Sequence, residues 1–235
     1  MNVEETRSCL PESVKQSFDD IVSGRSLGAS NHIKMISHMY AEIAKENDET
    51  TAKEYIEKVG QFFKKTRGES SYAIVNALEK VEKLIENSSE ENYTVRVESA
   101  VNTYFAQADQ DVEKILLYTD RLLKDKNTVM IYDYSSTVEK AVVKCSHKLK
   151  VYIPESRVIN GGFPFVEGIV NAGHEVCFIP DASMLTVLNE VDITFIGAET
   201  FYPDGTAFNT VGSDILAELC MYHNVPYYVL TPLLK

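Results

Sequence analysis

The sequence has 235 residues, 44% of them hydrophobic and 25% charged, which is enough for one large or two modest globular domains. Its 35 acidic and 23 basic residues give a formal net charge of -12, which disfavours a broad nucleic-acid surface but permits a local basic pocket for one phosphate. No apolar run approaches the roughly 20 residues that span a bilayer, and the N-terminus lacks the pattern of a secretory signal. We therefore expect a cytoplasmic protein with no membrane contact and no direct nucleic-acid partner.

The cysteines and histidines show no pattern of a metal site. The four cysteines lie far apart without a CxxC pair, and the five histidines have no metal-ligand spacing with them. Scattered cysteines of this kind are usually reduced thiols. We therefore predict no metal, and the cysteines in question are Cys9, Cys145, Cys177 and Cys220.

Residues 1–126 have the apolar periodicity of helices. Stripes at helical spacing fall within residues 14–22, 33–43, 52–63 and 73–85, and a polar linker at 87–92 precedes a long helix over 93–124. We expect Ser13 to cap the first helix and Ser30 or Asn31 to begin the second. The pattern predicts a helical domain that ends in a long connecting helix.

Residues 127–235 alternate short β-branched runs with helical stretches. Strands are expected at 129–132, 150–153, 175–179, 191–196 and 226–230, with helices at 137–147, 163–172, 183–189 and 215–223. Repeated βαβ units predict a parallel sheet with helices on both faces. The fold class is therefore α/β, with an N-terminal helical domain followed by a Rossmann-like parallel sheet domain. No GxGxxG follows the first strand, so we expect no nicotinamide or flavin cofactor.

Residues 191–218 form the leading candidate for half of a small-molecule site. The strand stops at Gly197-Ala198, Glu199 follows it, and Tyr202-Pro203-Asp204-Gly205 predicts a turn. Ser213 or Asp214 is expected to cap the next helix. Ligands of open parallel sheets bind beyond the carboxyl ends of the strands, near helix N-termini. The alternative is an ordinary crossover without a ligand.

Polar residues also follow the first strand. Ser135 and Ser136 stand at a helix N-terminus, where free N–H groups suit a phosphate. Asp133 would repel such an anion unless it binds a sugar hydroxyl or transfers a proton. The competing interpretation is that Ser135, Ser136 or Asp133 only caps the helix.

Three further segments carry candidate ligand contacts. Ser156 and Arg157 follow the second strand, and Arg157 can hold a phosphate or form a surface salt bridge to Glu155 or Glu167. Asp181 follows the third strand and is more consistent with helix capping than with ligand contact. In the helical domain, Arg67-Gly68 adds a candidate basic contact, because ligands often bind in clefts between domains.

Taken together, these motifs resemble the initiation-factor-2B alpha/beta/delta family, which also contains methylthioribose-1-phosphate isomerase and ribose-1,5-bisphosphate isomerase. The resemblance covers roughly residues 20–235, is clearest from 128 onward, and is weaker at Ser23-Gly24 and Arg67-Gly68-Glu69-Ser70-Ser71. Its main motifs are Tyr132-Asp133-Tyr134-Ser135-Ser136-Thr137-Val138, Glu155-Ser156-Arg157, Pro180-Asp181-Ala182, Val191-Asp192, Gly197-Ala198-Glu199, Asp204-Gly205, Asn209, Val211-Gly212-Ser213 and Pro226-Tyr227-Tyr228-Val229.

The resemblance implies a choice between two activities. The isomerases of the family use a cysteine where this chain has Asp133, an aspartate where it has Glu199, and an Asn-Lys pair where it has Asn209-Thr210. These departures make the chain more similar to the non-catalytic translation-factor subunits, with Asn209 among the ligand contacts. The alternative is a sugar-phosphate aldose–ketose isomerase that uses Asp133 and Glu199 as an acid–base pair.

The resemblance also implies partners. We expect other initiation-factor-2B-type subunits or a homodimer, a small phosphorylated metabolite as ligand, and no cofactor. The strand around Tyr227-Tyr228 is expected near the dimer contact. The family usually continues with another strand and a terminal helix, so the second domain, residues 127–235, looks shortened at its C-terminus.

Overall fold

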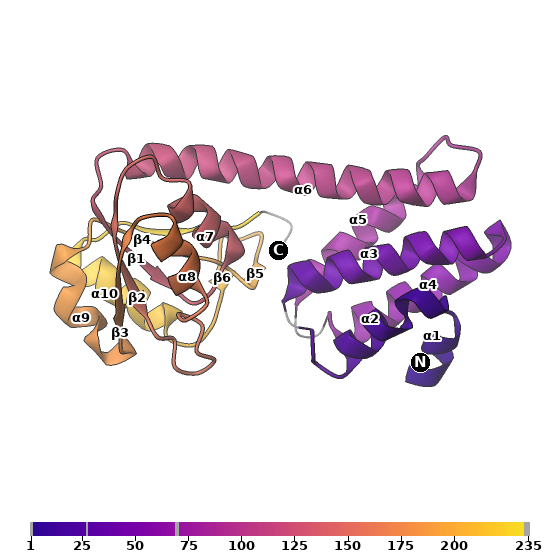
Figure 1. Cartoon of the computed structure of the whole chain (residues 1–235), viewed down its shortest axis with the longest axis horizontal. Coiled ribbons are helices and arrows are strands. Elements are labelled where there is room, and N and C mark those ends of the chain that lie inside the picture. Colours follow the sequence, from indigo (N-terminus) through magenta and orange to yellow (C-terminus); the bar gives the residue numbers. More distant parts are fainter. Residues whose placement is uncertain (1, 27, 69–70, 233–235) are drawn as a thin grey trace. The chain divides into compact units, whose positions relative to one another are not determined.

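The computed structural model describes residues 2–26, 28–68 and 71–232. The chain forms two compact units that divide between Asp109 and Gln110, inside the long helix α6 (Tyr93–Leu123) (Figure 1). The sequence places a boundary at 126–127, at the end of this helix. The units divide earlier because Leu116 and Leu123 belong to the core of the sheet domain.

The first unit is a helical domain built from amphipathic helices. Their apolar stripes meet in one core, which includes the fully buried side chains of Phe18, Tyr40 and Phe63. Phe18 packs against Phe62 and Phe63, with ring centroids 5.3 and 5.4 Å away. Besides the first part of α6, the helices are α1 (Val3–Ser8), α2 (Glu12–Val22), α3 (Ala29–Glu46), α4 (Glu49–Thr66) and α5 (Tyr72–Glu86).

Two predicted helix starts in this unit are wrong. Helix α2 begins at Glu12, directly after Pro11, so Ser13 lies inside the helix and does not cap it. Proline fixes φ near the helical value and lacks an N–H to satisfy, which suits it to a helix start. Helix α3 begins at Ala29 after Gly28, whose φ of 89° is the left-handed value that favours glycine.

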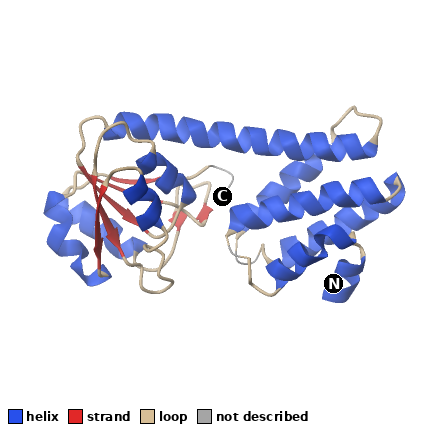
Figure 2. Ribbon diagram, viewed as in Figure 1, coloured by secondary structure: helices blue, strands red, loops and turns tan. Residues whose placement is uncertain are grey.

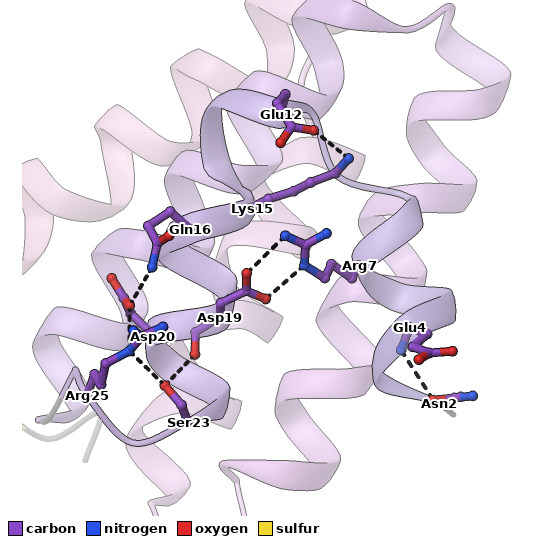
Figure 3. A network of polar contacts seen from close by, with 10 residues as sticks. All are labelled: Asn2, Glu4, Arg7, Glu12, Lys15, Gln16, Asp19, Asp20, Ser23 and Arg25. Carbon is purple, nitrogen blue, oxygen red and sulfur yellow. Dashed lines mark hydrogen bonds and ion pairs between the residues drawn. The ribbon is translucent and has the colours of Figure 1, made fainter.

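A polar network joins α1 to α2 (Figure 3). Arg7 donates two hydrogen bonds to the Asp19 carboxylate, at 2.8 and 2.9 Å, in the paired geometry that makes arginine–carboxylate contacts strong. Beside it, Asp20 pairs with Arg25 at 3.0 Å and Lys15 with Glu12 at 2.7 Å. Because the other two pairs lie within α2 or its C-terminal turn, Arg7–Asp19 is the pair that ties α1 to α2.

The second unit is a five-stranded, all-parallel sheet with helices on both faces, as predicted (Figure 2). Its strand order is β3-β2-β1-β4-β7, and one apolar cluster covers each face. Such near-continuous burial of the inner strands is typical of parallel sheets. The strands are β1 (Thr128–Tyr132), β2 (Lys150–Pro154), β3 (Glu175–Ile179), β4 (Ile193–Ile196) and β7 (Tyr227–Val229).

The first three helices between these strands are shorter than the sequence predicts, whereas α10 begins two residues earlier than the predicted start at 215. Helix α7 (Ser136–Val143) ends before residues 144–147, where the His147 ring bonds to the Lys126 carbonyl at 2.7 Å. Helix α8 is Phe165–Asn171, and α10 is Ser213–His223. The third connection is a short helix, α9 (Met184–Val187), between the 3-10 turns η1 (Asp181–Ser183) and η2 (Leu188–Glu190).

A small hairpin follows β4, where the sequence predicts a loop. Strand β5 (Thr200–Phe201) pairs antiparallel with β6 (Ala207–Phe208). Residues 202–205 form the predicted turn, with Gly205 at φ 91° and its N–H donating to the Tyr202 carbonyl at 3.0 Å. Strands of two residues are too short to show an alternating pattern.

Candidate functional site at the switch point of the sheet

The candidate site lies where the strand order reverses direction. Strand β1 has β2 on one side and β4 on the other, and Tyr132 pairs with Ile196 at the last register position of β1 and β4. Asp133 and Gly197 therefore leave the sheet side by side. In doubly wound sheets ligands bind at this switch point, beyond the carboxyl ends of the strands.

The first strand end presents a buried carboxylate. Asp133 is only 3% exposed and has φ 57°, a left-handed value that is uncommon outside glycine. Its Oδ1 accepts a hydrogen bond from Ser156 Oγ at 3.2 Å and its Oδ2 one from Thr210 Oγ1 at 2.7 Å. Gly161 packs so closely on this carboxylate that a Cβ there would collide with Oδ1. Asp133 therefore joins three segments that are distant in the sequence.

The second strand end is fixed by Asp181. Ser156 is fully buried, and its backbone φ is 46°. Its N–H donates a hydrogen bond to Asp181 Oδ1 at 2.8 Å. The N–H of Arg157 donates to Asp181 Oδ2 at 2.9 Å. The 3-10 turn that begins at Asp181 has no side-chain cap, so the capping role expected for this carboxylate is wrong. Asp181 instead holds the loop after β2.

The Arg157 side chain lies on the surface. Its Nη1 donates to Asn160 Oδ1 at 3.2 Å, and Arg157 forms none of the ion pairs found in the described part of the chain. The predicted alternative of a salt bridge to Glu155 or Glu167 is therefore not formed. The phosphate-binding role of Ser156 and Arg157 stays a prediction.

Helix α7 begins as the sequence predicts. Ser135 is its N-cap, and its Oγ accepts a hydrogen bond from the Val138 N–H at 3.4 Å. Ser136 is exposed in the first turn. Gly197 of the neighbouring strand end lies against Ser135, because a Cβ on Gly197 would come within 2.6 Å of the Ser135 Cβ. The capping role is thus present, and a ligand contact of Ser135 and Ser136 stays a prediction.

At the fourth strand end, Glu199 differs from Asp133 in its exposure to solvent. The Glu199 side chain is exposed, and the backbone N–H of Glu199 donates to the Phe208 carbonyl at 2.9 Å. Asp133, in contrast, is buried and hydrogen-bonded to two hydroxyls. The acid–base pairing of Asp133 and Glu199 stays a prediction.

Residues 209–213, which follow the hairpin, contact the end of β1. Asn209 Nδ2 donates to Ser213 Oγ at 3.0 Å, and Tyr132 Oη donates to the Val211 carbonyl at 2.9 Å. The N-cap of α10 is Gly212, at φ 101°, so Ser213 and Asp214 lie inside the helix and the predicted cap is wrong. Only glycine suits this position, because a Cβ would collide with Tyr132 Oη.

Three carboxylates influence the Tyr132 hydroxyl at this strand end. Burial raises the pKa of the Tyr132 hydroxyl, with Ser156 opposing this and the carboxylates of Asp181, Asp133 and Asp214 adding to it. In the described residues, no lysine or arginine forms an ion pair with any of these three carboxylates.

Sequence reasoning missed the roles of Thr210 and Tyr132. The sequence marks Thr210 only as the residue in place of a lysine, yet its hydroxyl donates a hydrogen bond to Asp133. The sequence predicts Tyr132 only as a strand residue, yet its hydroxyl donates to the Val211 carbonyl in a distant loop. Each contact joins residues more than 70 positions apart, which no local pattern can reveal. The one available hint was the run of polar residues after β4.

Arg67 and Gly68 belong to the helical unit. The Arg67 guanidinium donates to the carbonyls of Ile21 and Val22, and so ties the end of α4 to the end of α2. Gly68 is buried, and a Cβ there would collide with the Lys64 carbonyl. Both residues therefore have structural roles within this unit, and their predicted ligand contacts stay predictions.

Residues 2–26, 28–68 and 71–232 hold no group of three His, Cys, Asp or Glu side chains placed to bind a metal ion. None of the helices in the described part of the chain is both long enough and apolar enough to cross a membrane.

The chain belongs to the initiation factor 2 subunit family, whose model matches residues 26–235. Its curated relatives include the ribose 1,5-bisphosphate isomerases of Methanocaldococcus jannaschii, 24% identical over 63% of this chain, and Archaeoglobus fulgidus, 32% identical over 47%. A Pyrococcus furiosus protein named as similar to subunit 2 of translation initiation factor eIF-2B is 23% identical over 94% of this chain. The chain spans 49%, 36% and 78% of these relatives.

Solved structures share the fold. Translation initiation factor eIF-2B from Pyrococcus horikoshii aligns with a TM-score of 0.80 at 22% identity, covering 95% of this chain and 82% of that one. A chain of the tetrameric eIF2B-beta2-delta2 complex from C. thermophilum aligns with a TM-score of 0.72 at 16% identity, covering 97% and 80%. 5-Methylthioribose 1-phosphate isomerase from P. horikoshii aligns with a TM-score of 0.67 at 20% identity, covering 97% and 66%.

Proposed function

We propose that this protein is an initiation-factor-2B-type subunit of the alpha/beta/delta kind. It serves the assembly and regulation of a guanine-nucleotide exchange complex in the cytoplasm, and it binds a phosphorylated sugar or nucleotide at the strand ends without efficient catalysis. Family membership and the likeness to eIF-2B structures support this proposal.

The proposal that this protein binds its ligand without efficient catalysis is supported by the hydrogen bonds of the Asp133 carboxylate. Both of its oxygens accept hydrogen bonds from protein hydroxyls, and the Glu199 side chain is exposed. A general acid and base must reach the same substrate atoms, and a misplacement near 1 Å can cost about a hundredfold in rate. The present geometry therefore supports binding better than turnover.

A sugar-phosphate isomerase is the second candidate. Asp133 and Glu199 follow β1 and β4, whose last residues pair in register, so one ligand at the switch point is close to both strand ends. Several relatives are named as isomerases of ribose 1,5-bisphosphate or methylthioribose 1-phosphate. If this candidate is right, Asp133→Asn and Glu199→Gln each abolish isomerisation while the fold is retained.

A thermal-shift titration tests the ligand. The panel contains ribose 5-phosphate, ribose 1,5-bisphosphate, methylthioribose 1-phosphate, nucleoside mono- and diphosphates, and inorganic phosphate. A ligand at about 100 times its dissociation constant stabilises the folded state by about 2.7 kcal/mol. We expect a selective shift with one phosphorylated sugar or nucleotide and no isomerisation at enzyme-like rates. Fast turnover of either isomerase substrate would favour the second candidate.

We also propose self-association or pairing with a second subunit of the same type. Tyr228 is 40% exposed on the edge strand β7, and Met221 and Tyr222 of α10 are 70% and 81% exposed. Groups of large exposed apolar side chains are typical of subunit contacts. Light scattering at micromolar concentration should give a molar mass twice that of one chain. The Tyr222→Glu variant should have the molar mass of a single chain. A monomer at all concentrations would leave only pairing with a different subunit.

A further inference from the structure

Cys145 differs from the other cysteines of the chain in what its thiol contacts. The thiols of Cys9 and Cys220 are buried, and each lies 3.4 Å from an oxygen, that of a backbone carbonyl or of a threonine hydroxyl. The Cys145 Sγ lies 3.5 Å from His147 Nδ1. Such oxygens leave the proton on the thiol, whereas an imidazole nitrogen can take it. In the described part of the chain, Cys145 is therefore the cysteine whose thiol contacts a base.

The hydrogen of the His147 imidazole is fixed by a group outside this pair. The Nε2 atom of His147 lies 2.7 Å from the Lys126 carbonyl. Because a carbonyl can only accept a hydrogen bond, Nε2 carries the hydrogen, and in the neutral imidazole Nδ1 is left as an acceptor. The Cys145 S–H therefore donates to Nδ1. A nucleophile beside a base that a third group orients is the arrangement by which proteins activate thiols.

The pair is accessible, and its thiol depends on the base. Cys145 and His147 are part-buried, and Ser146 between them is exposed. Burial raises the pKa of the Cys145 thiol and the charge of Asp120 adds to this, whereas the backbone N–H groups of His147 and Ser146 oppose it. The thiol is therefore protonated at neutral pH. Since the thiolate is the nucleophile, the sulfur reacts once the imidazole has taken its proton.

We propose that Cys145 is a modification site at which a small disulfide forms a mixed disulfide with the protein, with His147 as the base. The thiol proton passes to Nδ1, and the Cys145 sulfur attacks one sulfur of the small disulfide. The S–S bond of the small disulfide breaks as the new S–S bond forms, so Cys145 is oxidised and the departing sulfur is reduced. The departing thiolate takes the proton from Nδ1, which restores the neutral imidazole. Because the pair follows the C-terminal end of α7, and the candidate ligand site adjoins the N-terminus of that helix, this modification is independent of the proposed function.

Reaction of the full chain with hydroxyethyl disulfide, followed by mass spectrometry of the modified peptides, tests this site. The reagent is uncharged, so the net charge of -12 does not repel it. Cys177 is the internal reference, because it is part-buried like Cys145 but lies on the edge strand β3. We expect Cys145 to react at least about tenfold faster than Cys177, since a positioned base contributes about a hundredfold or more to such proton transfers. In urea the two cysteines should react at similar rates.

The variant His147→Gln separates the base from the structural contact. A glutamine amide can donate to the Lys126 carbonyl as Nε2 does, but it has no basic nitrogen. This variant should react about tenfold more slowly at Cys145, while the rate at Cys177 and the urea midpoint stay unchanged.

Two results would overturn the site. One is a Cys145 rate no higher than that of Cys177 in the unaltered chain. The other is an unchanged Cys145 rate in His147→Gln that is folded by circular dichroism. The comparison of the two cysteines needs no variant, so it decides the question if His147→Gln does not fold.

Discussion

At the scale of single residues, the site depends on backbone conformations that side chains normally avoid. Asp133 and Ser156 both have left-handed φ values, 57° and 46°, and both are buried. Such conformations cost about 1–3 kcal/mol each and persist only where the surroundings enforce them. Here they direct the carboxylate of Asp133 and the hydroxyl of Ser156 toward each other. Gly161, which packs on that carboxylate, is therefore as important as the polar groups.

Replacing Gly161 by alanine should destabilise the protein by about 1–3 kcal/mol, the usual cost of overpacking. The added Cβ would collide with Asp133 Oδ1, so the carboxylate or the loop must shift. Urea unfolding measures the loss. The matched comparison is Gly161→Ala in an Asp133→Ala background, where the carboxylate that the added Cβ would meet is absent. An equal loss in both backgrounds would mean that the contact with Asp133 is not tight.

His174 gives a second residue-scale prediction. It is buried, its Nε2 bonds to the Val142 carbonyl at 2.9 Å, and its Nδ1 accepts from the Leu149 N–H at 3.2 Å. In His174→Phe the Val142 carbonyl keeps its bond from the Cys145 N–H, but the Leu149 N–H loses its partner. We expect a loss of about 1–3 kcal/mol, the cost of one buried unsatisfied group, in urea unfolding. A loss below 0.5 kcal/mol, about the size of a surface effect, would contradict this.

At the scale of secondary-structure elements, much of the sheet domain could be predicted. Strand β3 matches its predicted bounds, and β1, β2, β4 and β7 differ from theirs by one or two residues, because buried parallel strands are short continuous apolar runs between turn residues. The helix ends were less predictable. Gly212 caps α10 although serine and aspartate stand next to it, since its conformation and its contact with Tyr132 come from tertiary structure.

The site could be predicted only in part for the same reason. Alternation of strands and helices places the polar strand ends at one edge, and the sequence therefore indicates Asp133, Ser156 and Asn209 as neighbours of a common site. It does not indicate that Thr210 bonds to Asp133 or that Asp181 holds the loop of Ser156. Those contacts depend on how the loops fold over the sheet, and no local periodicity encodes that.

The contact between α1 and α2 predicts an acid-sensitive element. The hydrogen bond from Arg7 holds the pKa of Asp19 below its usual value. A depressed carboxylate pKa means that the unfolded chain binds more protons, so this contribution is present above the unfolded pKa of about 3.9 and is lost as pH falls through the folded pKa. Asp19→Asn should therefore lower stability at pH 6 and have progressively less effect below about pH 4.

Urea unfolding of both chains between pH 3 and pH 7 measures this dependence. Asp109→Asn, which changes an exposed carboxylate of the same unit, is the control and should leave the difference near zero at every pH. Because the Arg7–Asp19 pair is part-exposed, added salt should also reduce the effect. A destabilisation by Asp19→Asn that is the same at pH 3 and pH 6 would show that lost packing, and not charge pairing, is responsible.

At the scale of the whole molecule, the long helix α6 serves two cores. Tyr93, Val97 and Tyr104 lie in the core of the helical unit, whereas Leu116 and Leu123 lie in the core of the sheet domain. The sheet domain is therefore incomplete without the second part of α6. We infer that the folding unit begins near residue 110, and that the sequence-based boundary at 126–127 would remove one wall of its core.

Two fragments test this boundary. Residues 110–235 should fold alone, with native-like circular dichroism and cooperative urea unfolding. Residues 127–235 lack Leu116 and Leu123, and losing a buried leucine costs about 2–5 kcal/mol each, which is comparable to the total stability of a domain, about 5–15 kcal/mol. We expect this shorter fragment to aggregate or to unfold without cooperativity. Leu123→Ala in the longer fragment is the graded control, expected to fold with a lower urea midpoint. Equal midpoints for both fragments would place the boundary at the end of α6, because the second part of that helix would then contribute nothing to the core.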